Sequence, residues 1–410
     1  MSTTAVSTTP YPIPPVAPDV GEVFAFAARE IAAAAAGLWP RSAIDLGDHV
    51  PSVTGYVRRI RVDGRTLYAK YSLLGVSLVS LLRGACGPWP QARARQQAYV
   101  RRADALMDRE AAQLRLLARL GEPQVCPVAG LERGVLFTEP VTGPTLADLL
   151  LQRPRETAAL LQGAFGELHQ LHRMDAARLL ATAGVIGERS IRGTFQRKFN
   201  GISGTAYLDR LGADRYTPDD QHLIADLLRR TVDRLRRMSS TGLPPAVAER
   251  VPVYGDPKPE HILFPDQQTG RAVFLDPGLL LATPVVDAAK LISRTALLLA
   301  AVRPGPRHGE AVVCGVGAFA AARMDVLPGS GRRAWLRELL VLWLMDSVNI
   351  LTTYLSAPAS LPLPAQGAGL VQRAVDLCRI TDQISAELAA GADAPVVWES
   401  MLDRARAVAV

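Results

Sequence analysis

The spacing of apolar and polar positions predicts a small mixed region followed by a mainly helical one. Val20–Leu38 is rich in alanine and Met107–Leu120 repeats apolar residues at helical spacing, so both are predicted to be helices. Gly55–Val62 and Arg65–Lys70 are predicted strands, which the turn Asp63-Gly64 joins into a hairpin. Beyond residue 140 the chain is predicted to be mainly helical around one strand-rich segment.

That segment, Val253–Gly278, has two short apolar strands around a turn, with an aspartate in each half. Asp256 leads the first half, and Asp276 lies at the end of the strand Ala272–Leu275. Two carboxylates with separate tasks suit phosphoryl transfer, because one can accept the proton of an attacking hydroxyl while the other holds the metal ion that bridges nucleotide phosphates. The segment is therefore the candidate catalytic segment.

Composition is compatible with this interpretation and narrows the class of protein. The 410 residues are 49% apolar, enough for one large core or two moderate cores. The four cysteines are widely spaced, so we expect neither a disulfide framework nor a zinc site, and a cytoplasmic location. The N-terminus has no signal-like segment, and apolar runs such as Leu339–Met345 are far shorter than the roughly 18 residues of a membrane span, so no membrane partner is expected.

Lysine is rare in this chain, and its positions are therefore informative. Of 46 basic residues only four are lysines. Lys258 follows Asp256 by two positions, and Lys70 ends a predicted strand. A compact ammonium can contact phosphate oxygens where a broad guanidinium does not fit, so both lysines are candidates for phosphate binding.

The candidate catalytic segment resembles that of the kinase-like superfamily, in particular the aminoglycoside phosphotransferase and choline-kinase branch. The family pattern is H-G-D-x-x-x-x-N followed by D-x-G. Asp256 and Asp276 match its two aspartates, whereas Tyr254 replaces its histidine and His261 replaces its asparagine. The resemblance implies an α+β fold of two lobes, a small mixed N-lobe and a large, mainly helical C-lobe. It also implies ATP and Mg²⁺ as cofactors. His261 makes Mn²⁺ an alternative metal, because Mn²⁺ accepts nitrogen ligands more readily than Mg²⁺.

The same resemblance assigns roles to individual residues. It makes Asp256 the catalytic base, Lys258 a second catalytic residue that steadies the phosphate, and Asp287 a support for the catalytic loop. Asp276 and His261 become the metal ligands; in a second interpretation His261 instead hydrogen-bonds Asp256. The expected nucleotide-binding residues of the N-lobe and hinge are Lys70, Glu110, Glu139, Val141, Ser52 and Thr54.

Two of these assignments carry more detail. Glu110 lies on the predicted helix Met107–Leu120 and should pair with Lys70, and backbone groups around Glu139–Val141 should bind adenine. Further along, the predicted helix Ala159–His172 contains Leu168-His169, which resembles a family helix, and His169 is interpreted as a packing residue.

The expected domain organisation follows from these motifs and predicted elements. Residues 1–20, rich in Pro, Ser and Thr, are expected to be a disordered tail. Residues 21–139 form the N-lobe, with a basic insertion at about 71–106, and residues 140–410 form the C-lobe, with the catalytic segment at 253–287.

The region of the basic insertion holds much of the net charge. Arg83 to Arg119 contains eight arginines against three acidic residues, a balance of +5 in a chain of net charge +7. It is either a solvated helix face or a docking surface for an acidic partner, such as the leader of a precursor peptide or a partner subunit. Nucleic acid is not expected as a partner, because aromatic residues for base stacking are sparse there.

Three functions remain open. The first is an ATP-dependent O-phosphotransferase acting on a small hydroxylated molecule of natural-product type, in antibiotic resistance or biosynthesis. The second is a Ser/Thr kinase that phosphorylates a ribosomally made precursor peptide ahead of dehydration, because Asp256 to His261 resembles the D-L-K-P-E-N loop of protein kinases. The third is a catalytically inactive kinase-like partner protein, since His261 and Pro277 depart from the metal-binding pattern.

Overall fold

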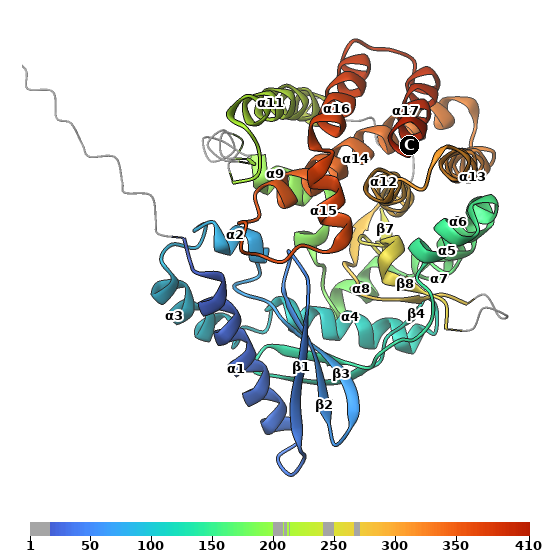
Figure 1. Cartoon of the computed structure of the whole chain (residues 1–410). Coiled ribbons are helices and arrows are strands. Elements are labelled where there is room, and N and C mark those ends of the chain that lie inside the picture. Colours follow the sequence, from blue (N-terminus) through green and yellow to red (C-terminus); the bar gives the residue numbers. More distant parts are fainter. Residues whose placement is uncertain (1–16, 200–207, 209–210, 213, 241–249, 266–270) are drawn as a thin grey trace, which may run out of the picture.

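A computed structural model of the chain describes residues 17–199, 208, 211–212, 214–240, 250–265 and 271–410. It has the expected α+β architecture of two lobes, with a small sheet in one and mostly helices in the other (Figure 1). Most of the predicted tail, residues 1–16, lies outside the described residues, and the lobe boundaries stay a prediction.

The N-lobe is built on a five-stranded antiparallel sheet of order β1-β2-β3-β6-β5. The predicted hairpin is present as β2 and β3, with Val62 opposite Arg65. Alternate residues of β2, among them Tyr56 and Ile60, are buried while Arg59 is exposed, as expected of a sheet with one face on a core. The strands are β1 (Ile44–Val50), β2 (Tyr56–Val62), β3 (Arg65–Tyr71), β5 (Val128–Glu132) and β6 (Val135–Thr138).

Two predicted helices flank this sheet. Helix α1 spans Val20–Leu38, as expected, and begins where Asp19 Oδ1 accepts a hydrogen bond from Glu22 N at 3.0 Å. Helix α4 spans Leu106–Leu120 and ends at Gly121, whose φ of +79° is favoured by glycine. The basic insertion forms two helices, α2 (Leu78–Leu82) and α3 (Trp89–Tyr99).

The C-lobe is a helical assembly around the long helix α14 (Gly329–Leu355). Among the described residues α14 alone is long and apolar enough to cross a membrane, and 94% of its apolar window is buried inside the protein. The other helices are α5 (Leu146–Gln152), α6 (Thr157–Gly166), α7 (His169–His172), α8 (Ala176–Thr182), α9 (Ile191–Phe199), α11 (Pro218–Ser240), α12 (Val285–Val302), α13 (Pro306–Met324), α15 (Ala365–Gln372), α16 (Ala374–Ala389) and α17 (Ala394–Val408).

The expectation of one continuous helix over Ala159–His172 is wrong. Helix α6 ends at Gly166, and α7 begins only at His169. Gly163 and Gly166 lie near the break, and glycine is a poor helix former because it loses the most backbone entropy.

Small strand pairs hold the candidate catalytic segment. β7 (Val251–Val253) pairs with β10 (Leu280–Ala282), and β8 (Ile262–Leu263) pairs with β9 (Val273–Phe274). β9 also pairs in parallel with β4 (Gln124–Val125), which follows α4. Through this pairing, the candidate catalytic segment is hydrogen-bonded to β4, which precedes strand β5 of the N-lobe sheet.

A buried glutamine on α4 connects that helix to the C-lobe. Gln113 is fully buried; its Oε1 accepts from Leu279 N at 2.9 Å and its Nε2 donates to Gly184 O at 3.0 Å. One side chain therefore satisfies backbone groups from two separate C-lobe segments.

Replacing Gln113 should weaken the fold measurably. Gln113→Leu keeps the volume but leaves the Leu279 N–H and the Gly184 carbonyl without partners, which should lower the free energy of unfolding by about 1–3 kcal/mol. Chemical denaturation would measure this. Gln97→Leu, at an exposed position of α3, is the matched control and should change stability by less than about 0.5 kcal/mol. Equal effects of the two substitutions would contradict the prediction.

Candidate active site

The loop that carries Asp256 is fixed by a carboxylate beneath it. Asp287, in the first turn of α12, accepts hydrogen bonds from Tyr254 N at 2.9 Å and Gly255 N at 2.6 Å. Gly255 has a φ of +79°, and a Cβ there would lie 2.3 Å from Gly278 O, so no other residue fits. These contacts are the ones that the predicted supporting role of Asp287 requires.

The histidine that joins this support is His172 and not His169. His172 Nε2 lies 3.0 Å from Asp287 Oδ2, whereas His169 is exposed at the start of α7. The interpretation of His169 as a packing residue is therefore wrong. His172 follows the buried Phe165 and Leu168 at helical spacing and so lies on the inner face, whereas His169 lies off it. Leu168 to His172 contains the spacing L-x-x-L-H, which could have identified His172 from the sequence.

Tyr254, which replaces the family histidine, ties the two halves of the segment together. Its side chain is fully buried, and its hydroxyl donates to Leu275 O at 2.9 Å. Leu275 directly precedes Asp276, so this bond links the loop of Asp256 to the second aspartate.

Asp256 is held between two lysines. Lys258 Nζ lies 2.8 Å from its Oδ2 and Lys290 Nζ lies 3.1 Å from its Oδ1. Burial alone would raise the pKa of Asp256, but Lys258 and Lys290 more than offset this, and its pKa lies well below the usual range. The carboxylate is therefore ionised at neutral pH.

Lys70 joins the N-lobe to the second aspartate. Its Nζ lies 3.0 Å from Oε1 of the fully buried Glu110, which is the predicted pair, and also contacts Asp276 Oδ1. Arg189 contacts the other oxygen of Glu110, and its Nη1 donates to Pro277 O at 2.7 Å. The strand lysine, the helix glutamate and the aspartate thus form one connected group of charges.

Asp276 and His261 lie together, as the predicted metal site requires. Asp276 has a φ of +58°, a left-handed conformation that aspartate tolerates better than most residues. His261 Nδ1 lies 3.1 Å from Asp276 Oδ2, but it is buried and makes no hydrogen bond to the described residues. The described residues show no hydrogen bond from His261 to Asp256, so the second interpretation of His261 is not what the structure contains.

The donor set fits a divalent ion that is completed by phosphates and water. Burial, with Lys258 adding to it, lowers the pKa of the His261 imidazole well below its usual range, so the ring is neutral. Among the described residues no group of three or more His, Cys, Asp or Glu gathers as a metal cage. Mg²⁺ needs none, because it commonly takes one or two protein ligands beside phosphate oxygens and water.

The other residues expected to bind nucleotide are Glu139, Val141, Ser52 and Thr54. The Glu139 side chain pairs with Arg65, and its backbone N–H donates to Pro127 O at 2.9 Å, so that amide is not available to adenine. Ser52 and Thr54 lie between β1 and β2, where Ser52 Oγ accepts from Thr54 N at 3.3 Å. A role for Ser52, Thr54 or Val141 in nucleotide binding stays a prediction.

The arginines of the basic region from Arg83 to Arg119 are partly committed to contacts within the protein. Arg109 reaches the C-lobe and pairs with Glu188, and Arg102 pairs with Asp104. Arg93 and Arg101 are exposed. Docking of an acidic partner there stays a prediction.

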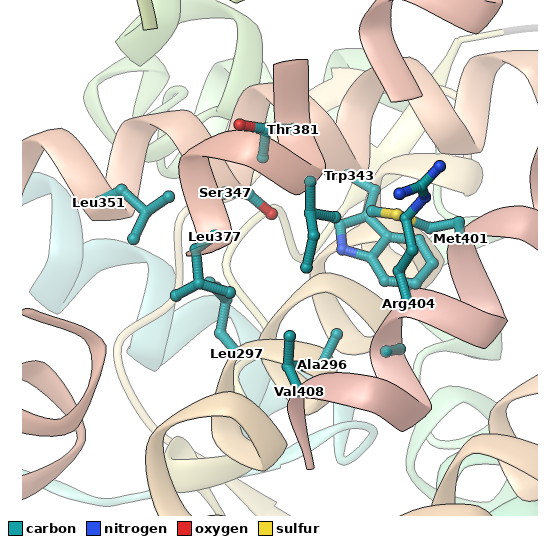
Figure 2. A pocket seen from close by; sticks show the side chains of 12 residues that line it. Ala296, Leu297, Trp343, Ser347, Leu351, Leu377, Thr381, Met401, Arg404 and Val408 are labelled. Carbon is teal, nitrogen blue, oxygen red and sulfur yellow. The ribbon is translucent and has the colours of Figure 1, made fainter. Parts of the chain in front are cut away.

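A cavity of about 40 Å³ lies among α12, α14, α16 and α17 (Figure 2), and Asp256 is not among the residues that line it. Its walls are mostly apolar, with Trp343 and Leu351 from α14 and Val408 from α17. Sites for drug-sized ligands are typically about 300–1,000 Å³, so this cavity is too small to hold a molecule of that size.

No known family model matches the chain, and no characterised protein matches it in sequence. Solved structures with a similar arrangement include kinases and antibiotic phosphotransferases. An amicoumacin kinase is 12% identical with a TM-score of 0.47, over 82% of this chain and 87% of that one. An aminoglycoside-3′-phosphotransferase of type VIII is 20% identical with a TM-score of 0.43, over 77% and 98%.

An ethanolamine kinase from Plasmodium vivax is 10% identical with a TM-score of 0.43, over 82% of this chain and 84% of that one. At these identities and scores the resemblance is distant. The roles proposed below therefore rest on the contacts of this chain's own residues.

Glu110 should make stability depend on pH. Burial alone would raise its pKa, and Arg189 and Lys70 more than offset this, so the pKa lies below its ordinary value of 4.5. A depressed pKa stabilises the fold above the unfolded value and loses that contribution as pH falls. Glu110→Gln should cost about 3–5 kcal/mol at pH 7, because it leaves buried cations without their counter-charge.

The difference between wild type and Glu110→Gln should narrow as pH falls below about 4.5. Urea denaturation at several pH values would measure it, with Glu156→Gln, at an exposed position, as the control. A difference that does not change with pH would contradict the prediction.

Proposed function

We propose that this protein is an ATP-dependent phosphotransferase that transfers a phosphoryl group to a hydroxyl. The observation that carries the proposal is the placement of Lys70 between Glu110 and Asp276. Kinase-type transfer needs a strand lysine that is paired with a helix glutamate and lies beside the aspartate that holds the metal ion. The loop of Asp256 is tied to the chain beside Asp276 by Tyr254. The carboxylate of Asp256 is then the group that contacts the acceptor hydroxyl.

The chain's own residues divide the work of transfer. Lys70 binds nucleotide phosphate oxygens, and Asp276 with His261 would hold Mg²⁺, which neutralises charge on the β- and γ-phosphates. Asp256 accepts a hydrogen bond from the acceptor hydroxyl, orients it towards the γ-phosphorus and takes its proton as the new O–P bond forms and ADP leaves. Lys258, 2.8 Å from Asp256, is close enough to contact the phosphoryl group in transit.

We propose a small hydroxylated molecule of natural-product type as the acceptor, in resistance or in biosynthesis. A Ser/Thr peptide is the second candidate, favoured by the position of Lys258, which contacts Asp256 as the protein-kinase-like loop would require. The third, an inactive partner protein, is disfavoured because the charged contacts of Lys70, Asp256 and Asp276 are all in place.

One screen separates the three candidates. The protein would be incubated with ATP and Mg²⁺, in parallel with hydroxylated antibiotics and with Ser/Thr-containing peptides, and mass spectrometry would detect an added phosphate. A phosphorylated antibiotic supports the first candidate and a phosphorylated peptide supports the second. Absence of ATP binding in calorimetry would refute the proposed function.

Asp256→Asn should remove transfer but not nucleotide binding. A positioned base contributes roughly 10²–10⁴ in rate, and Asp256 has no proposed contact with ATP, so kcat should fall by about that factor while the Kd for ATP changes little. Transfer of labelled phosphate and calorimetry would measure the two quantities. Lys70→Ala, in contrast, should raise the Kd for ATP, because it removes a proposed contact with the nucleotide phosphates. Asp403→Asn, at an exposed position, is the matched control and should change neither quantity. Weak ATP binding by Asp256→Asn with unchanged kcat would contradict its role.

His261→Asn should change the metal preference. Mg²⁺ favours hard oxygen donors, whereas Mn²⁺ accepts imidazole nitrogen more readily. If His261 is a ligand, the asparagine variant should need less Mg²⁺ for half-maximal activity and should lose any preference for Mn²⁺. Activity titrated with each metal would show this. An unchanged metal profile would leave Asp276 as the only protein ligand.

A further inference from the structure

The second lysine that contacts the proposed catalytic base comes from within the protein core. Lys290, on α12, has its Nζ 3.1 Å from Asp256 Oδ1 and 2.8 Å from Asp346 Oδ1. Its side chain is 4% exposed. One ammonium therefore bridges the carboxylate of the active-site loop and a carboxylate of the helix α14.

Asp346 is itself firmly held. It is 1% exposed and accepts from Arg294 Nε at 2.7 Å and from Ser293 Oγ at 2.7 Å, besides its contact with Lys290. Burial alone would raise the pKa of Asp346, and Arg294 and Lys290 lower it well below the usual range. The position of Lys290 is thus fixed by two packed helices, α12 and α14.

The two lysines on Asp256 differ in their freedom to move. Lys258 lies on the loop just before the turn Pro259–His261, and its side chain is 15% exposed, whereas that of Lys290 is 4% exposed on a helix. Lys258, on a loop, therefore has more room to turn towards a bound phosphate than Lys290, whose Nζ is also held by Asp346. If it does so, a buried Asp256 with no second partner would be left as an isolated charge, which is strongly unfavourable.

We propose that Lys290, held by Asp346, is a positioning residue that fixes Asp256 and keeps it paired while Lys258 moves to the transferred phosphoryl group. The inference rests on the proposed function and adds a residue to it. Lys290 touches neither nucleotide nor acceptor in this scheme, so it acts through Asp256. It should therefore influence the rate of transfer and not the binding of ATP.

Lys290→Met separates these effects. With ATP and Mg²⁺ as donor and the acceptor found in the screen, kcat should fall on the order of 10–100-fold, because a displaced catalytic group costs about that much, while KM for ATP stays within a few-fold. Asp346→Asn should lower kcat in the same direction but less, since Lys290 keeps a hydrogen-bond partner. An unchanged kcat in Lys290→Met, or a rise in KM that accounts for the whole loss, would overturn the inference.

Lys198→Met is the matched control. Lys198 lies on α9 and also hydrogen-bonds α14, at Asn349 O and Thr353 Oγ1. Its substitution therefore tests the loss of a different lysine that contacts α14. Its kcat should stay close to wild type. A loss equal to that of Lys290→Met would show that any weakening of the contacts to α14 lowers the rate, and would overturn the specific role of Lys290.

A stability cycle tests the contact without any need for activity. Lys290→Met should destabilise the protein because it leaves two buried carboxylates short of a cation, and Asp256→Asn combined with it should cost less than the sum of the two single changes. Full additivity would overturn the pairing of Lys290 with Asp256. Coupling in this cycle together with a wild-type protein that transfers no phosphate would instead refute the proposed function, so the two failures are distinguishable.

Discussion

Burial of negative charge is the constraint on which the junction of the two lobes depends. The four carboxylates of Glu110, Asp256, Asp287 and Asp346 are all 5% exposed or less. An unpaired buried charge is strongly unfavourable, so each requires cations or backbone N–H groups within hydrogen-bond distance. This requirement accounts for three of the four lysines, because Lys70, Lys258 and Lys290 each contact one or two of these carboxylates.

The same constraint couples the two lobes. Glu110 is on α4 of the N-lobe, yet it is shared by Lys70 on the sheet and by Arg189 from the C-lobe. Gln113, one turn further along α4, bonds C-lobe backbone at Leu279 and Gly184. Movement of α4 would therefore disturb ion pairs and backbone hydrogen bonds at once. The orientation of the lobes and the position of Lys70 are held by one set of contacts.

Much of this arrangement could be predicted from the sequence. The predictable parts are those that depend on neighbouring residues in the chain and those that contain a rare residue type such as lysine. The helix Val20–Leu38 and the hairpin at Asp63-Gly64 needed only periodicity and turn chemistry. The scarcity of lysine drew attention to Lys70, but its pairing with Glu110 was expected from the resemblance to the kinase-like superfamily. Arg189 and Asp346 could not be predicted, because their partners come from distant segments that only the packing of helices brings together. His172 was missed because the resemblance was assigned to Leu168-His169, although Leu168 to His172 has the spacing L-x-x-L-H and His172 contacts Asp287.

The low pKa of Asp256 bears on how a transferase of this kind would work. A carboxylate paired with two lysines is a weak base, so it cannot drive transfer by removing the hydroxyl proton early. Phosphoryl transfer passes through a loose transition state in most analyses, with little need for an early deprotonation. The value of Asp256 then lies in its orientation and in its acceptance of the proton late in the reaction. A fixed partner on one of its oxygens serves orientation well, and Lys290, held by Asp346, supplies it.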